Sequence, residues 1–207
     1  MSTPVIGVTG TIGTGKSTFA ETLTSQQGTH LDADDIAKDL MRPGHEGYDP
    51  VVEEFGKSIL DEDGFLRPDK LAEEVFSDTD KLSKLESILH PLVIDKLAEK
   101  IEQSDSSFYV IEAPLLFESG ADELCDWVVT VTAPEEIVNR RLKDRPLSDE
   151  DIKRRRERQL DQSEKARRAD QVIDNRGSLN DLKEQARQLE QKILDRNLVG
   201  GEETYDT

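Results

Sequence analysis

The residues best suited to chemistry lie in one glycine-rich stretch, Gly10-Thr11-Ile12-Gly13-Thr14-Gly15-Lys16-Ser17. Its spacing fits G-x-x-x-x-G-K-[ST], the phosphate-binding loop. The glycines let the backbone approach phosphate oxygens closely, and N–H groups of the loop and of the following helix then point at the anion. Lys16 can reach the β- and γ-phosphates of a nucleotide, and the Ser17 hydroxyl can ligate Mg²⁺. We therefore predict a nucleotide phosphate site, the alternative being a turn that binds nothing.

The segments on either side of this loop fit the prediction. Residues 5–9 are mostly apolar and β-branched, which is typical of a short buried strand. Residues 17–23 are expected to open the first helix. The loop therefore joins the end of a strand to the start of a helix, as a phosphate-binding loop must.

A second candidate for chemistry follows a short apolar segment at residues 29–31. We expect that strand to end at or near Asp32 and a helix to begin about Asp34, and either aspartate could cap the helix. Open α/β sheets bind ligands at the carboxyl ends of their strands. For Asp32 we therefore favour a functional role, whereas for Asp34 and Asp35 we favour capping.

Three further segments are typical of strands: residues 108–112, which end at Glu112, residues 127–131, and residues 171–174. Five short strands that alternate with helices predict a parallel three-layer α/β sheet. Residues 48–104 show only helical periodicity and are too long for a simple crossover. We expect this insert to bind substrate, and the alternative is a purely structural helical cap.

The last helix is expected to begin at the cap residue Ser178. Its apolar residues repeat with helical spacing and should share one face. They are Leu179, Leu182, Ala186, Leu189 and Ile193.

Nine arginines gather within one segment: Arg140, Arg141, Arg145, Arg154, Arg155, Arg156, Arg158, Arg167 and Arg168. On solvated helices they would form i,i+4 ion pairs with neighbouring acids, which we expect for most of them. A mobile lid that closes on a triphosphate needs bidentate cations, and arginine suits that task. We therefore predict a lid over residues 140–168.

The 207 residues carry a formal charge of −18, with the acids spread along the chain. This charge argues against general nucleic-acid binding, which needs a basic face.

No apolar run approaches the ~20 residues of a membrane span, and we expect no signal peptide. Cys125 is the single cysteine, which fits a reducing cytoplasm. One hypothesis is that this cytoplasm is salty, and its rival is that the acids are merely solvated.

Taken in order, the motifs resemble those of the dephospho-coenzyme A kinase family, over about residues 5–195. The resemblance is carried by residues 7–18, Asp32-Ala33-Asp34, Ile36-Ala37, Leu89-His90-Pro91-Leu92, Pro114-Leu115-Leu116-Phe117-Glu118, Arg141-Leu142, Ala169-Asp170 and Val172-Ile173-Asp174-Asn175. The phosphate loop alone is shared by many unrelated enzymes, whereas the ordered set is specific to this family. It implies transfer of the γ-phosphoryl group of ATP to the ribose 3′-hydroxyl of dephospho-CoA, which gives CoA and ADP.

The resemblance also implies residue roles. Asp32 matches the residue that accepts the hydroxyl proton, and Lys16 and Arg141 complete the catalytic set. The implied ATP-binding residues are Gly10, Thr11, Ile12, Gly13, Thr14, Gly15, Lys16, Ser17, Thr18, Asn175 and Gly177. The implied acceptor-binding residues are Asp32, His90, Glu112, Pro114 and Leu115, and Ser17 is the implied Mg²⁺ ligand.

Two features depart from the family pattern. Glu112 stands where many members carry aspartate. The turn at residues 145–148 is slightly shorter than the usual lid turn, which leaves open which lid arginine reaches the phosphates.

The implied organisation is a P-loop kinase core (residues 1–42, 105–139 and 169–199), a helical CoA-side domain (43–104), the lid (140–168) and a disordered tail (200–207). We expect a cytoplasmic monomer that uses ATP and Mg²⁺ and has no nucleic-acid or membrane partner.

Two other functions remain open from the residues alone. A kinase for another small acceptor, such as a nucleoside monophosphate or a sugar, would fit the loop and the lid, although Asp32 and Leu89-His90-Pro91 disfavour it. A non-enzymatic GTP switch would need an Asn-Lys-x-Asp element, which the sequence lacks.

Overall fold

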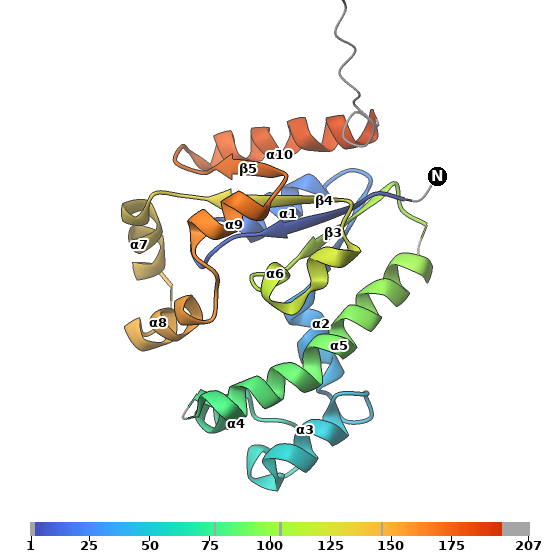
Figure 1. Cartoon of the computed structure of the whole chain (residues 1–207), viewed down its shortest axis with the longest axis vertical. Coiled ribbons are helices and arrows are strands. Elements are labelled where there is room, and N and C mark those ends of the chain that lie inside the picture. The colour runs from blue at the N-terminus through green and yellow to red at the C-terminus, as the bar shows by residue number, and fades with distance from the viewer. Residues whose placement is uncertain (1–2, 77, 104, 146, 196–207) are drawn as a thin grey trace, which may run out of the picture. The chain divides into compact units, whose positions relative to one another are not determined.

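The computed structural model describes residues 3–76, 78–103, 105–145 and 147–195 (Figure 1). The chain divides into two compact units. Asp32–Gln103 form a helical unit, and the described residues before and after it form a sheet unit. The first boundary falls at the last residue of a strand, so Asp32 still ends a strand of the sheet. The predicted tail at 200–207 lies outside the described residues.

The sheet unit is built on five strands in the order β2-β3-β1-β4-β5. The strands are β1 (Val5–Thr9), β2 (Gly28–Asp32), β3 (Phe108–Glu112), β4 (Trp127–Thr132) and β5 (Gln171–Asp174). β1 pairs in parallel with both β3 and β4, and all residues of β1 and β3 are buried. Burial on both faces explains their apolar runs. The prediction of a five-stranded parallel α/β sheet is confirmed.

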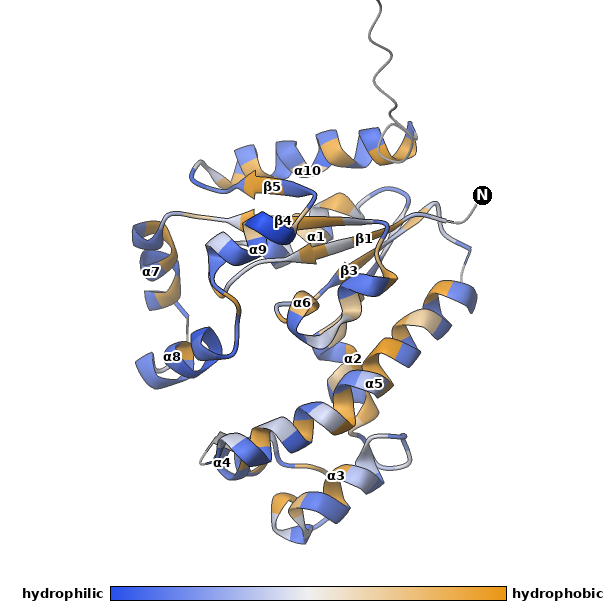
Figure 2. Ribbon diagram, viewed as in Figure 1, coloured by the Kyte–Doolittle hydropathy of each residue, from blue (hydrophilic) through white to orange (hydrophobic). Residues whose placement is uncertain are grey.

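Helices α1 (Lys16–Leu23) and α10 (Leu179–Leu194) pack against each other and share the main core with the strands. Figure 2 shows the apolar residues of α10 interrupted by polar ones, as expected for a helix with one buried face. Ser178 caps α10 as predicted, because its Oγ accepts the N–H of Asp181 at 3.2 Å. The predicted residues share one face of α10, but this face is not buried at its start. Leu179 is the first residue of the helix and is 56% exposed, whereas the other four residues of the predicted face are buried.

The arginine-rich segment forms three helices, α7 (Glu135–Lys143), α8 (Asp149–Glu157) and α9 (Gln162–Arg168). Val138 and Leu142 bury one side of α7, whereas α8 has no buried residue. Several of the arginines pair with acids within hydrogen-bond distance, for example Arg154 with Glu150 at 2.8 Å. Such pairs agree with the expectation of solvated helix faces.

The helical unit contains α2 (Ala33–Leu40), α3 (Tyr48–Phe55), η1 (Lys57–Ile59), α4 (Pro68–Phe76) and α5 (Thr79–Gln103). It has a core of its own, formed by Val51, Ile59, Leu71, Val75 and Leu89 among others. Helix α2 groups with this unit, although the predicted core domain extended to residue 42. The short segment α6 (Leu116–Ser119) and η2 (Ala121–Leu124) lie between β3 and β4 of the sheet unit. Among the described residues, no helix has the length and hydropathy needed to span a membrane.

Candidate active site

The glycine-rich loop connects β1 to α1, with Gly15 as the N-cap of the helix at φ 101°. A side chain at Gly10 would place its Cβ 2.5 Å from the carbonyl oxygen of Val131. At Gly15 the Cβ would lie 2.4 Å from Nδ2 of Asn175. These glycines therefore let the loop lie close against β4 and Asn175 in a backbone conformation that other residues rarely adopt. The N–H groups at the start of α1 are left free to bind an anion.

Asn175 and Arg141 hold this loop from the side of β5 and α7. The Asn175 side chain is 3% exposed, and its Nδ2 donates to the Thr14 carbonyl at 2.7 Å. The Arg141 guanidinium donates to the same carbonyl at 3.3 Å and to two oxygens of Asn175 at 3.2 Å. Burial, and then the charge of Arg140, lower the pKa of Arg141. These acceptors are uncharged, so the guanidinium lies beside the phosphate loop with its charge available to an anion.

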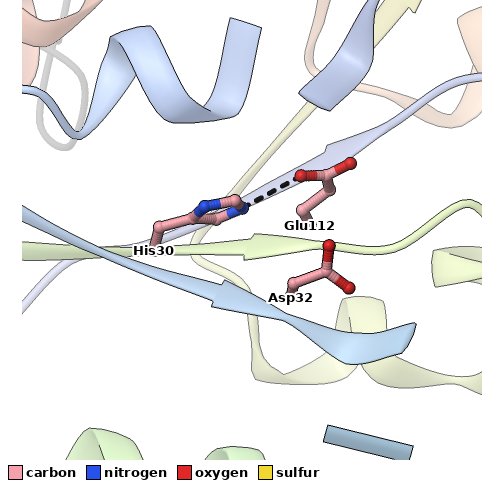
Figure 3. A group of neighbouring side chains, drawn as sticks. All are labelled: His30, Asp32 and Glu112. Carbon is pink, nitrogen blue, oxygen red and sulfur yellow. Dashed lines mark hydrogen bonds and ion pairs between the residues drawn. The ribbon is translucent and has the colours of Figure 1, made fainter. Parts of the chain in front are cut away.

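Glu112 ends β3 and joins three side chains of the site. Its Oε1 accepts a hydrogen bond from Ser17 Oγ at 2.5 Å and lies 3.1 Å from Lys16 Nζ. Its Oε2 lies 2.9 Å from His30 Nε2 (Figure 3). Burial alone would raise the pKa of Glu112, but the His30 hydrogen bond, the Lys16 charge and the Ser17 hydroxyl outweigh it and lower the pKa to about 2. Glu112 is therefore a buried anion at the phosphate loop.

Asp32 ends β2 and is also the N-cap of α2. Its Oδ1 accepts the N–H of Asp35 at 3.0 Å, so the cap is Asp32 and not Asp34 or Asp35. The other carboxylate oxygen, Oδ2, can therefore bind a further group. Capping and a functional role are thus compatible for this residue.

His30, Asp32 and Glu112 each offer one ligand atom within 4.8 Å of the others (Figure 3). His30 and Asp32 are two residues apart in one strand, so they lie on the same face of the sheet. His30 was not predicted as a site residue, although its spacing from Asp32 in a predicted strand was a signal in the sequence. Together with the Ser17 hydroxyl, the two carboxylates supply the oxygen donors that Mg²⁺ prefers.

The remaining predicted residues lie in three places. Pro114 and Leu115 form the connection from β3 to α6, and Gly177 precedes the cap of α10. A Cβ at Gly177 would lie 2.5 Å from Asp181 Oδ2. His90 lies on α5 in the helical unit.

One contact of the loop and one cavity beside it were not predicted from the sequence. The N–H of Ile12 donates to Gln159 Oε1 at 3.1 Å. A cavity of about 280 Å³ also lies beside the loop. It is lined by Thr11, Ala133, Glu135, Val138, Arg156, Gln159, Leu160, Asp161 and Gln162.

The chain is similar to known proteins over most of its length. The profile of the dephospho-CoA kinase family matches residues 4–181. A dephospho-CoA kinase from Aquifex aeolicus is 40% identical over 190 residues, which cover 91% of this chain and 96% of that protein. The solved structure of the Campylobacter jejuni dephospho-CoA kinase is similar with a TM-score of 0.70 at 30% identity, covering 96% of this chain and 100% of that one. A Thermus thermophilus structure gives a TM-score of 0.79 at 32% identity, with 97% and 100% covered.

The family profile spans well over half of the chain, and it includes the glycine-rich loop, Asp32, Glu112 and Arg141. The relatives match the chain over nearly their whole length. The chain therefore belongs to the dephospho-CoA kinase family of P-loop kinases, which phosphorylate dephospho-CoA with ATP in the last step of coenzyme A biosynthesis.

Proposed function

We propose that the phosphate loop, Glu112 and Asp32 form the phosphoryl-transfer site, and that Asp32 orients the 3′-hydroxyl of the acceptor. The observation that carries this proposal is the position of Glu112, which contacts Lys16 and Ser17 and has the Asp32 carboxylate within 4.8 Å. Glu112 thus lies between the Asp32 carboxylate and Lys16, the cation that would bind the nucleotide phosphates, which supports the proposal. Phosphoryl transfer depends mainly on alignment and charge stabilisation. Asp32 would therefore align the hydroxyl and accept its proton late in the transfer.

On the nucleotide side, the loop N–H groups and Lys16 would bind the β- and γ-phosphates. Ser17 would hold Mg²⁺, with Glu112 as the adjoining carboxylate. When bound, Mg²⁺ would supply positive charge that offsets the negative charge of the phosphates during transfer. Arg141 would add a cation from the lid side. Asn175 and Gly177 would bind the adenine end of ATP.

On the acceptor side, Pro114 and Leu115 would contact dephospho-CoA next to Glu112. We also propose that His90 of the helical unit binds dephospho-CoA. We also propose that the protein acts as a monomer. A cytoplasmic location would supply ATP and keep Cys125 reduced.

An acceptor panel tests the proposed reaction. ADP release is measured with dephospho-CoA, a nucleoside monophosphate or a sugar as the only acceptor, and with ATP or GTP as donor. We expect ADP release to depend on dephospho-CoA, and Lys16→Ala to weaken both ATP binding and turnover. Equal turnover with another acceptor would contradict the assigned specificity, and nucleotide binding without transfer would favour a switch.

A further inference from the structure

Lys165 of α9 is a lysine whose side chain is completely buried at 0% exposure. Its Nζ donates to Glu118 Oε1 at 2.8 Å, to Glu118 Oε2 at 2.9 Å and to the Pro114 carbonyl at 2.9 Å. Burial lowers the pKa of Lys165, and the hydrogen bond and charge of Glu118 oppose that effect. Three of its hydrogen bonds hold the ammonium group to the residues after β3, and a fourth, at 3.5 Å, goes to Thr9 Oγ1 at the end of β1.

Glu118 makes a further contact that bears on the same segment. Its Oε1 accepts the N–H of Leu160 at 2.7 Å. The ring of Phe117 lies 5.8 Å from Lys165 Nζ and 5.9 Å from the Arg168 guanidinium, within the range of cation–π contacts. The connection at residues 114–118 is therefore joined to residues 160–168 by a buried ion pair, a backbone hydrogen bond and an aromatic contact.

The segment that carries Lys165 also contacts the nucleotide side of the site. Gln159 Oε1 accepts the N–H of Ile12 in the phosphate loop at 3.1 Å. Gln162 Oε1 accepts the N–H of Ala133, just after β4, at 3.0 Å. Residues 159–165 therefore contact the phosphate loop, the end of β4 and the connection that holds Pro114.

We propose that Lys165 and Glu118 are positioning residues. They hold the acceptor loop, defined as residues 114–118, in a fixed position relative to the phosphate loop. This inference rests on the proposed role of Pro114 and Leu115 in acceptor binding. Two apolar side chains of similar volume could replace a buried ion pair without loss of stability. They could not bind the Pro114 carbonyl or the Leu160 N–H. The ion pair therefore fixes the positions of the Pro114 carbonyl and the Leu160 N–H, which apolar packing alone would not do.

The test therefore compares the thermal midpoint with the KM for dephospho-CoA. Lys165→Met and Glu118→Leu are made singly and together, and the thermal midpoint, kcat and both KM values are measured. Each single variant should lose stability, because it leaves a buried group without its partner. The double variant should regain a thermal midpoint near that of the wild type. Its KM for dephospho-CoA should stay raised by roughly 10-fold or more, because small misplacements of bound reactants are costly. Its KM for ATP should stay close to that of the wild type.

A double variant that regains both its thermal midpoint and its KM for dephospho-CoA would overturn the inference, because the pair would then be merely structural. Glu118→Gln retains the volume and serves if the double variant does not fold. A raised KM for dephospho-CoA in this variant supports the inference, and an unchanged KM overturns it. Lys153→Met is the matched control, because Lys153 is 75% exposed and pairs with Glu157 at 3.8 Å on α8.

Leu115→Ala separates this inference from the proposed function. A raised KM for dephospho-CoA in Leu115→Ala, beside an unchanged KM in the double variant, would overturn the positioning role alone. An unchanged KM in Leu115→Ala would refute the proposed acceptor loop, and the inference with it.

Discussion

The Ser17 hydroxyl donates a 2.5 Å hydrogen bond to the Glu112 carboxylate and so links the first turn of α1 to the end of β3. The same carboxylate is 2% exposed and lies 3.1 Å from Lys16 Nζ. A buried carboxylate is costly unless it is paired and hydrogen-bonded. Lys16, Ser17 and His30 provide those partners, so two of the residues proposed to bind the nucleotide also keep Glu112 ionised.

This arrangement predicts how stability depends on pH. The pKa of Glu112 is about 2 in the folded protein, below its usual value of 4.5. The charged carboxylate therefore contributes stability that is present above pH 4.5 and is lost as the pH falls toward 2. Glu112→Gln should be less stable than the wild type at pH 7, and the difference should shrink in acid. Urea unfolding at several pH values is the check, and a difference that does not vary with pH would contradict the account.

The contacts of Arg141 predict a kinetic effect. Arg141→Ala should lower kcat by about 10²-fold, in the range found when a charge-stabilising donor is removed. The KM for dephospho-CoA should change much less. Arg154→Ala is the control, because Arg154 pairs with Glu150 on α8. Steady-state kinetics with both substrates varied measure these effects. Equal losses of kcat in the two variants would argue against a role for Arg141 in charge stabilisation.

The arginine-rich segment predicts a nucleotide-dependent change in hydrogen exchange. Helix α8 has no buried residue, whereas Lys165 of α9 is buried. Opening should therefore be easiest around α8. A non-hydrolysable ATP analogue should slow exchange at 149–157 and leave 162–168 nearly unchanged. Exchange that is the same with and without the analogue throughout 140–168 would rule out a closing lid.

The net charge of −18 predicts a dependence on salt. At ~0.1 M salt the Debye length is about 10 Å, and at ~1 M it is about 3 Å, so molar salt screens repulsion between surface acids. If the protein is adapted to a salty cytoplasm, its thermal midpoint should rise steadily from dilute to molar KCl. Activity should also persist at those concentrations. A midpoint that stays flat or falls would favour acids that are merely solvated.

Local patterns in the sequence were enough to predict the strands, the phosphate loop and the cap at Ser178. Each of these depends on residues that are near one another in the chain. Leu179 followed the helical repeat but is exposed, because the repeat alone does not show where the helix first meets the core.

The contacts that complete the site join distant residues. His30 and Glu112 are 82 positions apart, and Lys165 and Glu118 are 47 apart. Their proximity follows from strand order and from the packing of α9, neither of which a single sequence displays. The sequence therefore predicted the glycine-rich loop and the strand that ends at Asp32. It did not predict the side chains that contact Glu112 and residues 114–118.

The most direct test of the account is phosphoryl transfer in a single turnover by Asp32→Asn. Asparagine is as good a helix N-cap as aspartate, so α2 should keep its cap. Labelled γ-phosphate is followed from bound ATP to dephospho-CoA, and the ATP dissociation constant is measured in parallel. We predict nearly normal ATP binding and a transfer rate about 10²–10⁴-fold lower, the usual contribution of a positioned acid or base. A transfer rate close to that of the wild type would contradict the role of Asp32 in the reaction.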